Sequence, residues 1–194
     1  MEELIYMTDS YVKEFDATVE EVEGDRVFLN KTAFYPTGGG FSHDTGVLIR
    51  KDDGKEFKVV DVIKDREKGR VAHVVEGDGL KAGMKVHGII DWDRRYRLMK
   101  MHTVAHALSA VILRHENALI TGGNLDLEKS RLDFNLAEFS KEKMEEYFKE
   151  LNEELKKGAA VKIHFMKREE VEANPSMARL AKGLPPGLKV LRVV

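Results

Sequence analysis

One stretch of the sequence, residues 91–116, separates two regions of different character: DWDRRYRLMKMHTVAHALSAVILRHE. From Arg94 to Glu116 it contains neither glycine nor proline, the residues that most often end a helix. Apolar residues recur through it with helical spacing, at Leu98, Met101, Ala105, Leu108, Val111 and Ile112. We therefore expect one long helix here, with a domain boundary close to Trp92.

Before this helix, the chain has the pattern of a small all-β domain. Short apolar runs alternate with glycine-rich turns, and Asp52-Asp53-Gly54 is a strong hairpin signal. The predicted strands cover residues 15–22, 26–30, 46–51, 55–62, 70–76 and 85–92. Many short strands at this spacing are typical of a small barrel, so residues 1–92 are predicted to form an N-terminal β-barrel domain.

After the helix, the pattern becomes mixed. Strands are predicted at residues 118–121, 131–136, 161–165 and 188–194, and helices at 141–157, 168–173 and 176–182. We expect residues 93–194 to form an α/β two-layer sandwich, which makes the whole chain an α+β protein. Because the apolar run at the end has no stop signal, we also expect the natural chain to continue past Val194.

The composition restricts the available chemistry. The chain has 194 residues, no cysteine and a formal net charge of −2. A disulfide, a thiol nucleophile and an iron–sulfur cluster are thereby excluded within this sequence. No apolar run is long enough to cross a membrane, and the acidic N-terminus lacks a signal-peptide core, so we expect a cytoplasmic protein without a membrane partner.

Two histidines, His102 and His106, stand four residues apart in the predicted helix. This spacing places both imidazoles on one helical face, where they can ligate one Zn²⁺ ion. At about 100° per residue, the pair lies about 130° from the centre of the apolar stripe. The alternative is an ordinary pair of helix histidines. Because position 103 is threonine, the glutamate of zinc peptidases is missing and a metallopeptidase is disfavoured.

A second motif lies in the β-rich region: Phe34-Tyr35-Pro36-Thr37-Gly38-Gly39-Gly40-Phe41. Its three consecutive glycines permit positive φ angles and a close approach of the backbone to a ligand. No Gly-Lys-Ser/Thr follows and no helix begins there, so the motif is a poor match to a phosphate-binding P-loop. The alternative is a barrel loop without a binding role.

Four cations open the long helix: Arg94, Arg95, Arg97 and Lys100. They lie at the end of the helix where the dipole disfavours positive charge, and a bound anion would relieve that cost. A phosphate-contacting patch for RNA is one interpretation. The other is a solvated helix face.

Taken together, these motifs resemble one family. The glycine motif, then Asp44-Thr45-Gly46, then residues 91–106, and then Thr121-Gly122-Gly123 with Arg131-Leu132-Asp133-Phe134 follow the order and spacing of the editing domain of alanyl-tRNA synthetase. Free-standing forms of this domain are the AlaX proteins, and the β-rich front region is similar to their medium-length type. The resemblance covers the chain from about residue 10 to its end.

The resemblance implies a trans-editing hydrolase that cleaves the ester of Ser-tRNA(Ala), with Gly-tRNA(Ala) as a second candidate substrate. It also implies a Zn²⁺ cofactor held by the two histidines of an HxxxH motif, which His102 and His106 match. The family completes the site with a cysteine and a histidine of a later CxxxH motif, which we expect beyond Val194.

The resemblance further implies a substrate-binding role for Thr121, near the serine hydroxyl, and for Gly38, Gly39 and Gly40 beside the pocket. No residue stands out as a catalytic acid or base. Two functional classes therefore stay open: an aminoacyl-tRNA deacylase, and a non-catalytic tRNA-binding module or degenerate editing domain. The missing second ligand pair favours the latter.

Overall fold

The computed structural model describes residues 2–138, 140–174, 177, 181, 183–184 and 187–194. The chain forms two compact units, Met1–Met99 and Lys100–Val194. One helix, α2 (Trp92–Glu116), contains residues of both units, so the unit boundary lies inside it. The sequence instead suggested a division just before Asp93, where the helical pattern begins.

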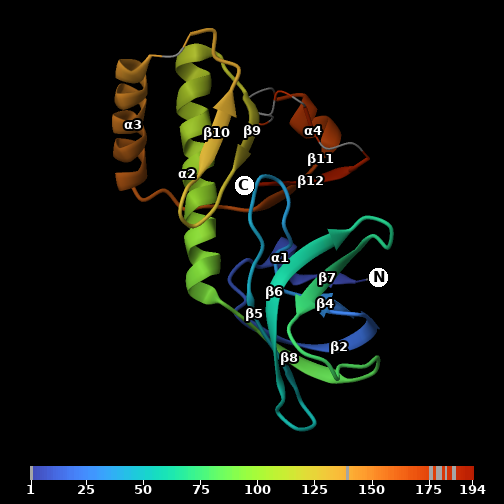
Figure 1. Ribbon diagram of the computed structural model, residues 1–194. Coiled ribbons are helices and arrows are strands. Elements are labelled where there is room, and N and C mark those ends of the chain that lie inside the picture. Colours follow the sequence, from blue (N-terminus) through green and yellow to red (C-terminus); the bar gives the residue numbers. More distant parts are fainter. Residues whose placement is uncertain (1, 139, 175–176, 178–180, 182, 185–186) are drawn as a thin grey trace. The chain divides into compact units, whose positions relative to one another are not determined.

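The first unit contains the predicted β-barrel (Figure 1). Antiparallel strands close in the order β2-β3-β7-β6-β5-β8. They are β2 (Glu14–Glu23), β3 (Arg26–Leu29), β5 (Gly46–Arg50), β6 (Glu56–Asp65), β7 (Arg70–Val75) and β8 (Lys85–Ile90). Beside the barrel, β1 (Glu3–Leu4) pairs in parallel with β4 (Lys31–Thr32), and the short helix α1 (Ile5–Thr8) follows β1.

The barrel is filled by alternate side chains of its strands. Along β2, Phe15, Ala17 and Val19 are buried, and the residues between them are exposed or half-buried. Phe34 and Phe57 join the same core and are at most 1 % exposed. The period of two in the sequence therefore reflects real burial on one face of each strand.

Two glycines allow β5 and β8 to approach each other and the core closely. A Cβ atom at Gly46 would lie 2.1 Å from the carbonyl oxygen of Ile89. A Cβ atom at Gly88 would lie 2.6 Å from the ring of Phe15. Since real Cβ contacts are not this short, these two positions accept only glycine without a shift of the backbone or the ring.

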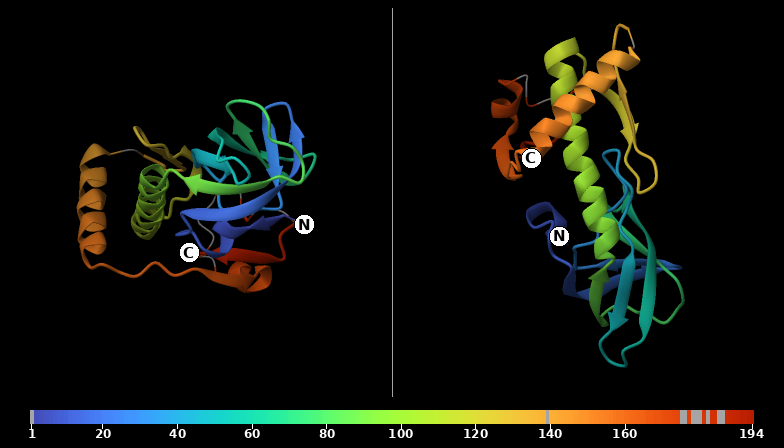
Figure 2. Two further views of the ribbon diagram at one scale, coloured as in Figure 1. Left: turned by 90° about the horizontal axis from the view of Figure 1, so that it is seen from below. Right: turned by 90° about the vertical axis from the view of Figure 1, so that its left-hand side faces the viewer.

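The second unit combines helices with two-stranded antiparallel ribbons. One ribbon is β9 (Ile120–Asn124) with β10 (Arg131–Phe134), and the other is β11 (His164–Lys167) with β12 (Val190–Val193). The helices are the C-terminal part of α2, α3 (Lys141–Lys156) and α4 (Arg168–Glu172). Figures 1 and 2 show α3 beside α2.

Apolar side chains of α2 and α3 form the core of this unit. Its buried members are Leu108, Val111, Ile112, Ala118, Tyr147 and Leu151. The helix α2 is followed by Asn117, whose φ of 52° is the left-handed conformation typical after a helix end. The helix α3 begins at Ser140, whose hydroxyl accepts a hydrogen bond from the Lys143 N–H at 3.3 Å, so the predicted N-cap is confirmed.

The α+β class is confirmed, and the helices predicted at 141–157 and 168–173 correspond to α3 and α4. The strand predicted at 161–165 is wrong in its start, because β11 begins at His164. Val161 is 59 % exposed, so its alternation with Ile163 does not reflect burial. The helix predicted at 176–182 falls largely outside the described residues. Within the part of the chain that is described, no helix is long and apolar enough to cross a membrane.

Candidate functional site

His102 and His106 meet on α2. Their Nε2 atoms are 2.8 Å apart, and their ring centroids are 4.5 Å apart with the planes inclined by 36°. The contact follows from the i, i+4 spacing, which places the two side chains one turn apart on the same face. Two ring nitrogens at this distance share either a proton or a cation, so at least one imidazole presents a lone pair.

The surroundings of His102 keep it neutral. Its pKa is lowered to about 3, mainly by burial and to a smaller extent by His106 and by Arg192 on β12. At neutral pH the His102 ring is therefore uncharged, and one of its two nitrogens has a lone pair in place of a proton. Neutral imidazole is the form that binds metal ions.

The two imidazoles fit one part of a zinc site. Zn–N bonds of 2.0–2.1 Å in tetrahedral geometry separate two nitrogen ligands by about 3.3 Å, so the pair would need to open by only about half an ångström. Among the described residues, however, no group of three or more histidine, aspartate or glutamate side chains is placed to hold a metal ion. The described residues thus supply two of the three or four ligands that zinc sites use.

Thr121 lies at an irregular point of the β9–β10 ribbon. Ile120 pairs with Phe134 and Gly122 pairs with Asp133, so Thr121 is the extra residue of a β-bulge. Its side chain is exposed. The hydroxyl is therefore accessible, and the substrate-binding role of Thr121 stays a prediction.

The glycines that follow Thr121 have a structural role in the ribbon. A Cβ atom at Gly123 would lie 2.7 Å from the Arg131 carbonyl oxygen, and one at Gly122 would lie 3.1 Å from Asp133 Oδ2. The Gly-Gly pair is therefore explained by the close approach of β10, without any ligand.

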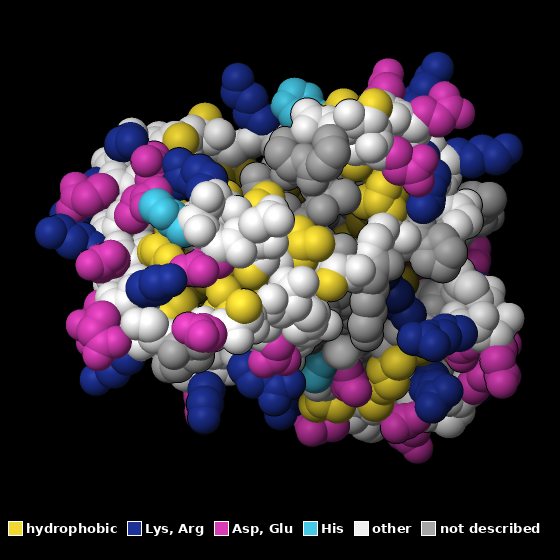
Figure 3. Space-filling view, turned by 90° about the horizontal axis from the view of Figure 1, so that it is seen from above, with side chains coloured by type: hydrophobic (Ala, Val, Ile, Leu, Met, Phe, Trp, Pro, Cys, Tyr) yellow, Lys and Arg dark blue, Asp and Glu magenta, His cyan; other side chains and the backbone are white. Residues whose placement is uncertain are grey.

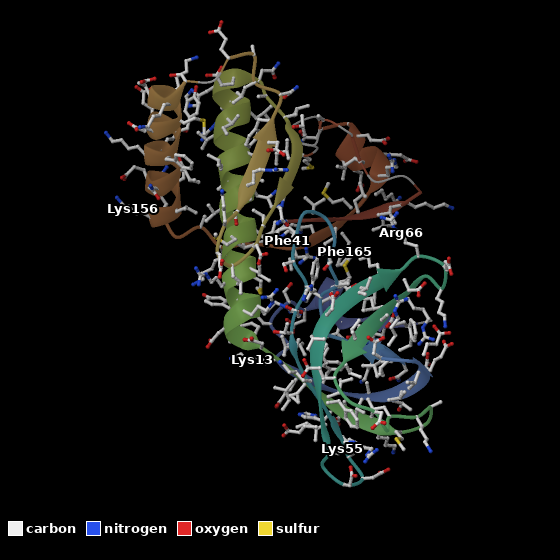
Figure 4. The ribbon with its side chains drawn as sticks, in the orientation of Figure 1. Lys13, Phe41, Lys55, Arg66, Lys156 and Phe165 are labelled. Carbon is white, nitrogen blue, oxygen red and sulfur yellow. The ribbon has the colours of Figure 1, made fainter. Side chains whose placement is uncertain are left out.

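In the first unit, Gly38, Gly39 and Gly40 form a tight hairpin turn. The Gly38 N–H donates to the Phe41 carbonyl at 3.2 Å, and the Phe41 N–H donates back at 3.1 Å. Gly39 and Gly40 have φ angles of 65° and 82°, as a type I′ turn requires at both central positions. Figure 4 marks Phe41 in this hairpin, between β4 and β5. The turn alone accounts for Gly39 and Gly40, and their substrate-binding role stays a prediction.

His43, which was not among the predicted site residues, has a defined environment beside this turn. Its Nδ1 lies 3.0 Å from Asp61 Oδ1 and 3.2 Å from Thr37 Oγ1. Within the described residues, Asp61 Oδ1 is buried without a well-aligned hydrogen-bond donor. The Nδ1 atom thus faces one oxygen of each of these two side chains. Sequence reasoning missed this pair because Asp61 lies on β6, far from His43 in the sequence.

The structure contradicts the prediction that Arg95 belongs to a phosphate-contacting surface patch. Its side chain is 5 % exposed and forms a salt bridge with Asp44, which is 1 % exposed. The guanidinium also donates to the carbonyls of Ser10 at 3.0 Å and Ala33 at 2.5 Å. Every face of the group is used inside the first unit, so Arg95 cannot contact a phosphate and does not belong to the predicted surface patch.

The remaining cations of the patch differ in environment. Arg94 is half-buried and donates to the His43 carbonyl and to Ser42 Oγ, both at 2.9 Å. Arg97 and Lys100 are exposed. On the face shown in Figure 3, basic and acidic side chains are interspersed and do not gather by sign. With Arg95 buried and Arg94 half-buried, Arg97 and Lys100 are the exposed members of the four, and their phosphate-contacting role stays a prediction.

The second unit also contains a pocket of about 590 Å³ between α2, the β9–β10 ribbon and α3. Its walls are mostly apolar, and they include Met101, Ala105, Leu132, Met144 and Phe148. Met101 and Ala105 each neighbour one of the two histidines in sequence. The sequence shows these residues only as part of an apolar stripe.

The sequence is similar to a family model and to several known proteins. A family model described as tRNA synthetases class II (A) matches residues 3–94. The alanyl-tRNA editing protein AlaX-M of Methanosarcina barkeri is 44 % identical over 200 residues, which cover 100 % of this chain and 82 % of the relative. The protein of the same name from Saccharolobus solfataricus is 43 % identical, with 100 % and 81 % covered.

The similarity extends to a longer enzyme. The alanine–tRNA ligase of Pyrococcus abyssi is 38 % identical over 195 residues, which cover 98 % of this chain but 21 % of the ligase. The chain therefore corresponds to a segment of that ligase, whereas it matches most of the length of the editing proteins. On this evidence the chain belongs to the AlaX-M family of alanyl-tRNA editing proteins.

Proposed function

We propose that the chain acts as a trans-editing deacylase that hydrolyses the ester bond of Ser-tRNA(Ala), with Gly-tRNA(Ala) as a second substrate. The observation that carries the proposal is the meeting of His102 and His106, whose Nε2 atoms lie 2.8 Å apart in a chain whose relatives are named for alanyl-tRNA editing. The choice of serine or glycine follows from the motif resemblance. The reaction belongs in the cytoplasm, where aminoacyl-tRNA is used.

His102 and His106 would hold one Zn²⁺ ion in this proposal. A cysteine and a histidine from outside these 194 residues would complete the ligand set. When bound, Zn²⁺ supplies Lewis acidity, which polarises an ester carbonyl or lowers the pKa of water. The chain's own contribution is to keep His102 neutral by burial, so that its lone pair is available at neutral pH.

Thr121 would select the amino acid. Serine differs from alanine by one hydroxyl, and a larger pocket that accepts serine also accepts alanine. A hydrogen bond to the hydroxyl discriminates better, because alanine leaves the partner unpaired. The exposed hydroxyl of Thr121 can both donate and accept such a bond.

The test is single-turnover deacylation of tRNA(Ala) charged with serine, glycine or alanine, in the presence of Zn²⁺. We expect rapid loss of serine and slow loss of alanine. Loss of an outer-shell partner of a metal costs about 10–100-fold, so His102→Asn/His106→Asn, which removes the proposed ligands themselves, should lower the rate on serine by more than that. Zinc content is measured in parallel. A protein extended past Val194 to include the expected cysteine and histidine should bind zinc more tightly than the 194-residue chain, because it has two further ligands.

The alternative is a non-catalytic tRNA-binding module. It is favoured by one observation, namely that the described residues provide only two zinc ligands. Wild-type protein that binds tRNA(Ala) but does not accelerate ester loss, with or without the continued reading frame, would support this alternative.

A further inference from the structure

Three aromatic side chains of the first unit contact one another beside the start of α2. The rings of Trp92 and Tyr96 lie 5.8 Å apart between centroids and are nearly parallel, at 19°. The ring of Tyr11 lies 5.8 Å from that of Trp92, inclined by 48°. We call Tyr11, Trp92 and Tyr96 the aromatic platform.

The platform is exposed, unlike the other aromatic clusters of the barrel. Tyr11 is 63 % exposed and Tyr96 is 42 % exposed. By contrast, the core rings of Phe15 and Phe34 are at most 7 % exposed. The platform also contains the single tryptophan of the chain. Exposed aromatic clusters of this kind mark binding surfaces, since the rings gain more from a partner than from water.

Cations flank the platform. The ammonium group of Lys13 lies 4.8 Å from the centroid of the Trp92 ring, and Figure 4 shows Lys13 beside the first turn of α2. Arg97, next to Tyr96 in the helix, is exposed. Lys13 is close enough to contact a ligand that lies on the rings, and Arg97 is the next residue after Tyr96 in the chain.

The nearby carboxylates are mostly engaged by the chain itself. Asp9 accepts the Tyr11 N–H at 2.8 Å, and Asp91 accepts the Arg94 N–H at 3.1 Å. Asp93 is exposed in the first turn of α2 and is a third acidic neighbour. A hydrogen bond from a neutral N–H leaves the charge of a carboxylate in place, so these three acids oppose an anion. The cations Lys13, Arg94 and Arg97 balance them in number.

We propose that the aromatic platform binds an unpaired strand of RNA, with bases stacked on Tyr11 and Tyr96 and with Lys13 and Arg97 on the phosphates. Flat exposed rings beside flexible cations are the combination that single-stranded nucleic acids use, because every base offers a π-face and every linkage a negative charge. The charged rim fits this ligand better than the apolar surface of another protein. The inference rests on the proposed function in taking RNA as the partner.

The test uses uncharged RNA, so its outcome does not depend on ester hydrolysis. Affinity is measured for a single-stranded RNA of about eight nucleotides, within the usual site size of such proteins, and for tRNA(Ala). Tyr11→Leu/Tyr96→Leu keeps apolar bulk but removes the flat rings, and we expect roughly tenfold weaker binding. Tyr11→Phe/Tyr96→Phe keeps the rings and should bind like wild type.

Two further variants separate stacking from charge. Lys13→Gln/Arg97→Gln should reduce the slope of log affinity against log salt by about 1.4, the value for two phosphate contacts on a single strand. Phe165→Leu is the matched control, because Phe165 is 53 % exposed but lies in the second unit. Its RNA affinity should not change.

Several results would overturn the inference. One is wild-type affinity in the double leucine variant, and another is an equal loss in the double phenylalanine variant. A third is a dimer, seen by sedimentation velocity, that dissociates on leucine substitution while RNA affinity stays constant. The single variant Tyr11→Leu is measured as well. Because this side chain is largely exposed, the variant should fold normally, and weaker RNA binding in it cannot be attributed to misfolding. Wild-type protein that binds RNA through the rings but hydrolyses no ester would contradict the proposed function and leave this inference standing.

Discussion

At the scale of single residues, Thr121 is the position where one atom should decide specificity. Thr121→Val keeps the shape of the side chain and the strand preference of the bulge but removes the hydroxyl. We expect hydrolysis of Ser-tRNA(Ala) to fall roughly tenfold or more, from the loss of about 1–3 kcal/mol of hydrogen bonding. Hydrolysis of Gly-tRNA(Ala) should change much less, and single-turnover assays of both substrates measure the difference.

Thr121→Ser is the matched control for this prediction, because it retains a hydroxyl on the same Cβ atom. It should keep most of the activity on serine. Equal losses on serine and glycine in the valine variant would remove Thr121 from the specificity role.

Gly46 is a residue whose importance comes from packing alone. In Gly46→Ala the new methyl group would meet the Ile89 carbonyl at 2.1 Å and the Phe34 ring at 2.9 Å. We expect the free energy of unfolding to fall by about 3 kcal/mol, the upper range for overpacking a core. Urea denaturation followed by circular dichroism gives the value.

Gly54→Ala provides the comparison. Gly54 has a φ of 73°, and a Cβ atom there would meet nothing within 4 Å. The expected cost is about 1 kcal/mol, from backbone conformation only. If the two variants were destabilised equally, close packing would not be the reason for glycine at position 46.

At the scale of elements, the first turns of α2 show two arginines with opposite roles. Arg95 is tied to Asp44 inside the first unit, and Arg97 is exposed. Arg95→Met leaves the Asp44 carboxylate buried and unpaired, so we expect a loss of about 3–5 kcal/mol in the free energy of unfolding. Asp44→Asn added to this variant should restore part of the loss, which a double-mutant cycle by chemical denaturation can measure.

Arg97→Met serves as the surface control and should change stability by less than about 0.5 kcal/mol. A small effect of Arg95→Met, similar to that of Arg97→Met, would show that the buried pair does not hold the start of α2.

The same turns show what a local pattern can reveal. The long helix was predictable because its apolar residues recur every three to four positions. The burial of Arg95 was not, since its partner Asp44 lies far away in the sequence. His43 and Asp61 escaped prediction for the same reason.

At the scale of the whole molecule, stability should depend on pH through a buried histidine. His73 is fully buried in the barrel, where Nδ1 lies 2.9 Å from the Val27 carbonyl and Nε2 lies 2.7 Å from Thr32 Oγ1. The Val27 carbonyl can only accept, so Nδ1 carries the proton, and in the neutral ring Nε2 accepts from the Thr32 hydroxyl, whose oxygen also accepts the Phe34 N–H at 3.1 Å. Burial lowers the pKa of His73 from 6.5 to about 4.

The sign of the pH effect follows from this shift. As the pH falls below 6.5, the unfolded chain takes up a proton that the folded chain refuses, so folding becomes less favourable until about pH 4. The loss from this group is about 3 kcal/mol and is absent above pH 6.5. Urea unfolding between pH 7.5 and pH 4 in a chelating buffer measures it.

His73→Gln is the control, because glutamine can replace both hydrogen bonds but does not titrate. His102, with a pKa lowered to about 3, contributes in the same direction and remains in the variant as a background. A pH dependence that is unchanged in His73→Gln would assign the effect to other groups.

The sequence predicted the positions of helices and strands better than the pairing of strands into a closed barrel. Strand positions in the first unit followed from apolar runs and glycine turns, but the pairing of β8 with both β2 and β5 joins segments distant in sequence. In the candidate site, the histidine contact was predictable because it lies within one helical turn. The roles of Gly39, Gly40 and Arg95 depend on turn geometry and long-range partners, which composition and spacing do not encode.

The turn at Gly39 and Gly40 uses a backbone conformation opposite in hand to the one that L-amino acids prefer. Both residues have positive φ angles, the region that is natural for D-amino acids and disfavoured for L-amino acids. Glycine is therefore suited to these two positions because it is achiral, more than because it is small. In a chemically ligated protein, D-alanine at position 39 or 40 would preserve the turn, whereas its mirror image, L-alanine, would oppose it.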